Sequence, residues 1–506
     1  MLELATKPFL KLGAVASLLD ALHQNDIQYC HWKSNEHLAA SMLADTDLDI
    51  LFAEDEKERL EKILHKLGFK RFDSIGSKQY KDIVDYLGMD AHSGKVIHLH
   101  THYRLSMGEP YLKSFQFKAD VEGIILKNRI FNEEFGIYCI QPAIELILLY
   151  IREALKLRHR DVFARLMADN RYPNKFVLAE YRWLKNRTSE EEVYEALKTI
   201  FNGDTSLFRL VTGEFSIVRL RRLASVIKNQ DTLKRLYSPI QALAVRWYRE
   251  GSVLLARKLY FALDRPTLFK RTNPRGGLVV SVIGADGSGK STVTGNLKNT
   301  FEPKLDIYKI YFGRGDGKAS PIRRLFNSAK TAVKAEKKTT RHRNEKSPST
   351  REKGFARSMS KCIEALLVAR EKRENLRLMQ AARNKGALVI CDRYPQNQIW
   401  GYNDGPLLHD FLTSRNPLLR LMAKIESRVY AEAENHPPDI VFKLIADAEV
   451  VERRKPGETS MEKLRTKING IKQLRFKDNC KVVTIDATRP LSEVLNVIKQ
   501  NIWNAL

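Results

Sequence analysis

The stretch SVIGADGSGKST, residues 281–292, constrains the fold more than any other part of the chain. Two apolar residues, Val282 and Ile283, end a predicted strand, and a glycine-rich turn then leads to Lys290 at the start of a predicted helix. Glycine permits backbone angles and close approach that a side chain would block, so the peptide N–H groups of such a turn can point into one concavity. The pattern G-x-x-x-x-G-K-[ST] in this setting predicts a nucleoside triphosphate site.

The residue types in this loop suit the phosphates of ATP and a Mg²⁺ ion. Lys290 can neutralise oxygens of the β and γ phosphates, and Ser291 can ligate Mg²⁺. The helix that starts at Lys290 adds the positive end of its dipole. We therefore expect ATP and Mg²⁺ as cofactors, a catalytic role for Lys290, and nucleotide binding by Gly284, Gly287, Ser288, Gly289, Lys290, Ser291 and Thr292.

Downstream of the loop, strand-like and helix-like segments alternate to residue 506. Short apolar runs such as ALVICD (387–392) and DIVFKLI (439–445) separate longer segments with helical periodicity. Strands that alternate with helices predict a parallel sheet covered by helices on both faces. We therefore place an α/β domain at residues 271–506, entered through a segment rich in Pro and Gly.

The first half of the chain has a different organisation. A chain of 506 residues is long enough for two or three domains. From residue 13 to residue 105 helical and strand-like segments alternate, which predicts a small α/β domain over residues 1–125. Residues 126–270 show helical periodicity with few strand signals, so we expect a mainly helical middle region there.

The net charge of the chain is strongly positive. A formal charge of +26 favours anionic partners without choosing among them. Part of the excess lies in a basic insert at residues 313–361, which has few of the aromatic side chains on which bases stack. We therefore expect a solvated lid that can hold an anionic acceptor. Nucleic acid remains a less favoured partner, peripheral membrane contact stays open, and the sequence predicts no oligomeric state.

We expect neither a signal peptide nor a membrane-spanning helix. The densest apolar run, AIELILLYI (143–151), contains a Glu and is far shorter than the roughly 20 residues that cross a bilayer. The five cysteines are scattered and form no C-x-x-C pair. These features predict a cytoplasmic protein with reduced thiols.

Three segments from the loop onward resemble the thymidylate kinase-like family of P-loop proteins. GADGSGKST (284–292) has Asp286 followed by glycine, as many members of that family do. VICDRYP (389–395) resembles the family's strand-end D-R-[YWF] motif, and the closing VVTIDATRPLSEVLNVI resembles its last strand and helix. The resemblance covers residues 278–506 and implies an ATP-dependent kinase.

The resemblance also implies roles for single residues. Asp392 would hold Mg²⁺ or its water, while Arg393 and Asp286 would face the phosphate acceptor. A structural ion pair between Asp392 and Arg393 is the alternative interpretation. The charged segment at residues 446–468 resembles the family's lid, whose catalytic arginines close over the nucleotide, and the candidates there are Arg453 and Arg454, with Lys455 beside them.

Two segments depart from the thymidylate kinase pattern. YFGRGDGKAS (311–320) stands where these kinases have an R-E-P-type loop, and DRYPQNQIWGYNDGP (392–406) lacks the Ser and Ala-Tyr-Gln that serve the thymidylate pocket. The departing motifs look like those of divergent thymidylate kinase-like proteins encoded among bacterial polysaccharide-synthesis functions. The acceptor can therefore be a nucleotide, a sugar or a glycan, and thymidine monophosphate is not the one that we favour.

A segment near the start of the chain resembles the minimal nucleotidyltransferase fold. HWKSNEHLAASMLADTDLDILF (31–52) has a serine, a short helix, and then Asp47 and Asp49 on one face of a strand, where two carboxylates can share a divalent metal. The later strand that should supply a third carboxylate carries histidines instead: His98, His100 and His102. A polymerase-like active site and a non-catalytic binding relic both stay open, and the histidines can ligate metal, bind phosphate or fill space.

Taken together, these features predict an ATP-dependent kinase in the second half of the chain. One alternative is a bifunctional protein, whose first domain transfers a nucleotidyl group to the substrate or product of the kinase. Another is a binding protein gated by ATP that grips nucleic acid or an anionic membrane surface.

Overall fold

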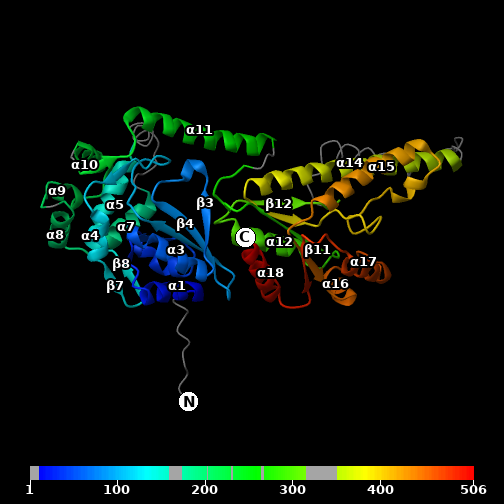
Figure 1. Cartoon of the computed structure of the whole chain (residues 1–506), viewed down its shortest axis with the longest axis horizontal. Coiled ribbons are helices and arrows are strands. Elements are labelled where there is room, and N and C mark those ends of the chain that lie inside the picture. Colours follow the sequence, from blue (N-terminus) through cyan, green and yellow to red (C-terminus); the bar gives the residue numbers. More distant parts are fainter. Residues whose placement is uncertain (1–10, 159–173, 202, 230–231, 264–266, 315–349) are drawn as a thin grey trace, which may run out of the picture. The chain divides into compact units, whose positions relative to one another are not determined.

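The computed structural model describes residues 11–158, 174–201, 203–229, 232–263, 267–314 and 350–506 (Figure 1). The chain forms two compact units: the first comprises Met1–Leu263 and Phe269–Pro274, and the second Asp264–Leu268 and Arg275–Leu506. Each unit combines a sheet with helices, which confirms the predicted α/β fold class. The further division of the first unit near residue 125 stays a prediction.

The first unit is built on a mixed sheet of eight strands. Their spatial order is β10 (Arg271–Thr272), β3 (Lys70–Ser74), β4 (Ile83–Met89), β5 (Val96–His102), β2 (Leu48–Phe52), β1 (Tyr29–His31), β8 (Ile137–Cys139) and β7 (Ile130–Asn132). β2 and β5 are parallel, and their register sets Asp49 beside His100. β4 and β5 are antiparallel, and their register sets Asp85 on the other side of His100. The sheet thus brings these three side chains to adjacent positions.

Helices of the first unit surround two apolar clusters. α5 (Pro142–Lys156), which contains the densest apolar run, is buried along most of its length in one cluster. The other helices are α1 (Gly13–Gln24), α2 (Leu38–Met42), α3 (Lys57–Lys66), α4 (Val121–Lys127), α7 (Lys175–Lys185), α8 (Glu190–Ile200), α9 (Phe208–Val211), α10 (Ile217–Asn229) and α11 (Pro239–Leu263).

The second unit contains a five-stranded sheet in which every pair of neighbouring strands is parallel. The order is β12 (Ile307–Tyr311), β13 (Leu388–Asp392), β11 (Leu278–Gly284), β14 (Ile440–Ile445) and β15 (Lys481–Asp486). Its helices are α12 (Lys290–Phe301), α14 (Thr350–Asn384), α15 (Pro417–Asn435), α16 (Ala448–Arg454), α17 (Met461–Gln473) and α18 (Leu491–Ala505). α14 and α15 lie side by side (Figure 1). The predicted parallel sheet covered by helices is confirmed.

Local backbone geometry sets the start of one strand of the first unit. β4 begins at Ile83, directly after Asp82, whose backbone is left-handed with a φ of 64°. The middle region also contributes short strands, including β8 and β9 (Leu233–Arg235), which pairs with β6 (Phe115–Phe117). Strands of three residues offer too few positions to show alternation.

Two further predictions concern the basic insert and the absence of a membrane-spanning helix. Most of the basic insert predicted at residues 313–361 lies outside the described residues, and its final residues belong to α14. Among the described residues, no helix is both long and apolar enough to span a bilayer.

Candidate functional site

The predicted phosphate loop connects β11 to α12 in the second unit. Gly287 and Gly289 have left-handed backbones, with φ values of 87° and 94°, which side chains rarely adopt. A side chain on Gly284 would place its Cβ 2.9 Å from the backbone oxygen of Leu444 in the adjacent strand β14. The glycines at these positions are therefore needed for the turn and for close packing against the sheet.

A cavity of about 1080 Å³, here called the phosphate cavity, opens around this loop. Besides the whole of Gly284–Val293, its lining includes Asp392 and Arg393 from the end of β13. Ligands of open parallel sheets bind beyond the carboxyl ends of the strands, which is where this cavity lies. Residues that the sequence analysis did not single out also line it: Lys309, Tyr311, Arg314, Asp404, Lys467 and Arg489.

Lys290 is held inside the loop by a backbone carbonyl. Its Nζ donates a 2.7 Å hydrogen bond to the oxygen of Ala285 and lies 3.7 Å from Asp286 Oδ1. Burial, followed by the charge of Arg393, lowers the pKa of Lys290 to about 8. An anion in the cavity would favour the charged lysine, so bound phosphate and the protonated side chain stabilise each other.

Ser291 and Asp392 are joined across the cavity floor. Ser291 Oγ donates a 3.0 Å hydrogen bond to Asp392 Oδ2. Among the described residues, the buried Asp392 Oδ1 has no hydrogen-bond partner. A buried carboxylate oxygen without a partner beside a hydroxyl is a donor set that fits Mg²⁺. These two residues could therefore hold the metal ion that the sequence analysis assigned to them.

Arg393 links two carboxylates at the wall of the phosphate cavity. It forms an ion pair with Asp286, and its Nη1 lies 3.3 Å from Asp404 Oδ2. Lys467 Nζ lies 3.4 Å from Asp286 Oδ2. Burial acts to lower the pKa of Arg393, but the two carboxylates raise it overall. Burial likewise acts to raise the pKa of Asp286, but Arg393 and Lys290 lower it to about 2.

The backbone of Arg393 explains how it reaches this position. Arg393 follows β13 with a left-handed φ of 70°, its N–H donates to the oxygen of Val282, and its carbonyl accepts from Ser281 Oγ. The described residues contain no ion pair between Asp392 and Arg393, so the alternative interpretation of a structural pair is not what the structure describes.

Asp404 is positioned by a loop that the sequence analysis noted only as a departure. Gln396 Nε2 donates to the carbonyl oxygens of Ile399 at 2.8 Å and Asn403 at 3.0 Å, and Gln396 Oε1 accepts from backbone N–H groups. The buried Lys372 of α14 donates a 2.8 Å hydrogen bond to the oxygen of Asp404. The segment DRYPQNQIWGYNDGP therefore forms an ordered wall that presents Asp404 to Arg393.

The predicted lid residues differ in their placement. Arg454 and Lys455 line the phosphate cavity, whereas Arg453 is exposed and is not part of its lining. Arg454 Nη2 donates a 2.9 Å hydrogen bond to the oxygen of Ala487. Lys455 pairs with Glu458 at 3.1 Å. Arg454 is thus the lid arginine that the structure brings to the site.

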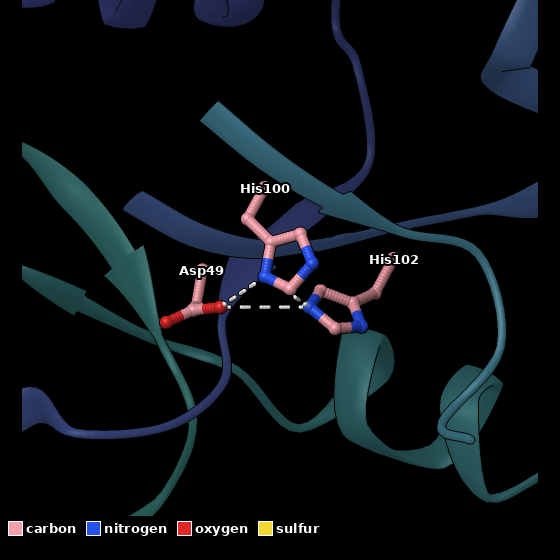
Figure 2. Close-up of side chains that lie close together, drawn as sticks. All are labelled: Asp49, His100 and His102. Atoms are coloured by element: carbon pink, nitrogen blue, oxygen red, sulfur yellow. Dashed lines mark hydrogen bonds and ion pairs between the residues drawn. The ribbon is translucent and has the colours of Figure 1, made fainter. Parts of the chain in front are cut away.

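The two aspartates predicted in the first unit are bound to different histidines. Asp47 Oδ1 lies 2.9 Å from His98 Nδ1, while Asp49 Oδ1 lies 2.8 Å from His100 Nδ1 and 3.5 Å from His102 Nε2 (Figure 2). Asp49, His100 and His102 therefore form a compact cluster, and the structure does not bring Asp47 into it.

Comparisons with known proteins locate relatives for about half of the chain. The chain is 29% identical over 244 residues to a protein of Escherichia coli K12 named "Uncharacterized ATP-binding protein YghR", which covers 46% of this chain and 91% of that protein. It is 28% identical over 240 residues to "Uncharacterized ATP-binding protein YghS" of the same organism, covering 45% of this chain and 93% of that protein. No protein-family model matches the chain.

Proposed function

We propose that the second unit is an ATP-dependent kinase of the thymidylate kinase-like type. ATP would bind with its phosphates on the loop between β11 and α12, and the names of the two relatives support ATP as the nucleotide. The observation that carries the proposal is the ion-paired Arg393, held by Asp286 and Asp404 in the same cavity as Lys290. A site for nucleotide binding alone does not need this second set of charges.

In the proposed reaction an acceptor oxygen attacks the γ-phosphorus of ATP in line with the bond to the β–γ bridging oxygen. That bond breaks, ADP leaves, and the proton of the acceptor goes to solvent. Lys290 neutralises charge on the β and γ phosphates, and Arg454 adds positive charge from the lid. Mg²⁺ bound by Ser291 and Asp392 would supply further neutralisation of the phosphate oxygens. Positioning and charge neutralisation are the main sources of catalysis in this chemistry.

Asp286 serves to position groups in this reaction and does not carry a proton. Its pKa of about 2 keeps the carboxylate ionised throughout the neutral range, so it is a weak base. The carboxylate can instead accept a hydrogen bond from an acceptor hydroxyl while it holds Arg393.

The charges around Arg393 favour an acceptor that carries hydroxyl groups. Arg393 and Lys467 are paired with two carboxylates, Asp286 and Asp404, which are good hydrogen-bond acceptors for hydroxyls. The lining also carries further cations, including Lys290, Lys309, Arg314 and Arg454, which can hold the phosphates of ATP. Of the nucleotide, sugar and glycan acceptors, we therefore favour a sugar or a glycan.

A labelled-phosphate transfer assay tests the proposal. ATP labelled at the γ position is incubated with Mg²⁺ and the full chain, in parallel with thymidine monophosphate, monosaccharides and a bacterial glycan fraction. Lys290→Ala should abolish transfer, and Lys298→Ala, which removes a lysine whose side chain is 42% exposed on the same helix, should retain it. Label on a hydroxyl acceptor supports the proposal, and label on thymidine monophosphate would overturn the preference for a sugar. ATP binding without any labelled product would favour a nucleotide-gated binding protein.

A further inference from the structure

Three side chains of the first unit converge on one point from two adjacent strands. Asp49 projects from β2, and His100 and His102 occupy alternate positions of β5, so they share a face of the sheet (Figure 2). Asp49 Oδ1 lies 2.8 Å from His100 Nδ1 and 3.5 Å from His102 Nε2, and the two nitrogens are 3.3 Å apart. Ligand atoms bound tetrahedrally at about 2.0–2.1 Å from a metal lie roughly 3.3 Å from one another.

From this arrangement we propose that Asp49, His100 and His102 bind a divalent transition-metal ion, and that the ion faces a phosphate-bearing ligand in an adjoining basic cavity. The proposal concerns the first unit and does not depend on kinase activity in the second. It also differs from a magnesium site shared by Asp47 and Asp49, because two imidazole nitrogens and one carboxylate suit zinc, cobalt or iron better than magnesium.

A carboxylate lies on the far side of the cluster. Asp85 Oδ1 is 4.0 Å from His100 Nε2, the nitrogen that does not face the proposed metal. Asp85 is held in turn by Ser74 at 2.7 Å, Arg271 at 3.2 Å and His98 at 2.7 Å. Histidine ligands of metals commonly have a carboxylate near their second nitrogen, which orients the ring and raises its basicity.

The adjoining cavity has a volume of about 500 Å³, and both His100 and Asp85 line it. Four basic side chains of the lining, Arg71, Lys78, Lys113 and Arg271, outnumber its three carboxylates, which belong to Asp73, Asp82 and Asp85. Burial, followed by repulsion from Lys33, lowers the pKa of Lys113 to about 7. An anion would favour the charged form of this lysine, and a phosphate group is the anion that such a set of cations binds well.

Lys33 competes with the proposed metal. Its Nζ lies 2.9 Å from Asp49 Oδ1, the same oxygen that would ligate the ion, and its side chain is 24% exposed. Metal binding therefore requires Lys33 to turn away from Asp49. Replacing it with an uncharged residue should consequently strengthen metal binding, since one positive charge no longer opposes another.

The test is a titration of the metal-free full chain with Co²⁺, followed by visible absorption, and with Zn²⁺, followed by calorimetry, both without nucleotide. We expect one ion per chain at this site, and at least about tenfold weaker binding in His100→Gln and His102→Gln. His92→Gln, which removes an exposed histidine of the same unit, should bind as the wild type does. Absence of binding, or equal binding in folded His100→Gln and His102→Gln, overturns the proposal.

A second variant keeps the test decisive if the histidine variants fail to fold. Lys33→Met leaves all three ligands in place and should bind Co²⁺ more tightly than the wild type, so equal or weaker binding overturns the metal site. Inorganic pyrophosphate serves as the probe for the basic cavity. It should change the Co²⁺ spectrum of the wild type and have at least about tenfold lower affinity for Arg271→Ala. An unchanged spectrum overturns the phosphate part of the proposal.

Discussion

Ser291 Oγ donates a 3.0 Å hydrogen bond to Asp392 Oδ2, which connects the first turn of α12 to the end of β13. The two residues are 101 positions apart in the chain, yet they meet because β11 and β13 are adjacent parallel strands whose register pairs Val282 with Asp392. The sheet therefore holds the proposed Mg²⁺ ligands together before any nucleotide binds. Binding then does not require free energy to order these two side chains.

Removing either member of this pair should reduce the effect of Mg²⁺ on ATP binding. We expect Ser291→Ala and Asp392→Asn to weaken ATP binding about tenfold or more in the presence of Mg²⁺, and to change it little in the presence of a chelator. Calorimetric titration under both conditions measures the difference. Thr300→Ala, near the far end of α12, is the matched control. A full Mg²⁺ effect in both variants would exclude the assigned ligands.

Replacing Gly284 or Gly295 with alanine should have opposite effects on the stability of the protein. In Gly284→Ala the new Cβ meets the backbone of β14, which cannot move aside, so we expect a lower melting temperature and ATP binding weaker by about tenfold. In α12, a Cβ added at Gly295 would meet no atom of another element within 4 Å, and alanine there should stabilise the helix by about 0.5–1 kcal/mol. Thermal unfolding with and without ATP compares the two variants. A stabilised Gly284→Ala would contradict the close packing.

Gln396 should matter for phosphate transfer more than for ATP affinity. Gln396→Ala removes the hydrogen bonds that order the loop leading to Asp404, so Arg393 loses one of its two carboxylate partners. We expect kcat/KM for the acceptor to fall about tenfold or more, with ATP affinity nearly unchanged, and faster proteolysis of this loop. Asn397→Ala, at an exposed neighbouring position, is the control. Unchanged transfer would show that the loop does not position Asp404 for catalysis.

Lys372 should make stability depend on pH above neutrality. Burial lowers its pKa to about 8 from an ordinary value of 10.5. Between these values the unfolded chain holds a proton that the folded chain has released, so stability rises with pH, and the gain is lost as the pH falls through about 8. The unfolding free energy of the wild type should therefore increase relative to Lys372→Met by about 1.5 kcal/mol between about pH 8 and about pH 9.5.

Urea unfolding followed by tryptophan fluorescence measures this difference at each pH. Lys361→Met, an exposed position of the same helix, should show no such trend. If the free-energy difference between the wild type and Lys372→Met stays constant with pH, then the buried lysine does not titrate in this range.

The residues of the phosphate cavity that were predictable from the sequence lie in continuous motifs. The loop glycines and Lys290 are contiguous, and Asp392 and Arg393 directly follow an apolar strand, so local pattern was enough to find them. Asp404 lies in a segment that was noted only for its departure from the thymidylate kinase pattern, and Lys372 lies in no motif, so neither residue was assigned a role. Their positions depend on a hydrogen-bonded loop and on the packing of a helix, which are tertiary effects without a local signature.

In the first unit, too, the contacts made through strand pairing could not be predicted from the sequence. Alternation predicts that His98 and His100 share a face of a strand, and Asp49 lies on a strand, β2, as expected. Which aspartate meets which histidine is decided by the register between β2 and β5, and register is not readable from either strand alone. Asp85 could not be found for the same reason, because β4 reaches the cluster through its pairing with β5.

Helix α14 contacts other segments of the second unit at several points along its length. Arg383 pairs with Asp439 before the start of β14, Met379 meets Cys391 in β13, and farther toward its amino end Lys372 binds the carbonyl of Asp404. α14 has 35 residues and is roughly 52 Å long, so the same helix contacts the sheet near its carboxyl end and the wall of the phosphate cavity at Lys372. A shift of α14 at Lys372 would therefore move Asp404 and change its ion pair with Arg393.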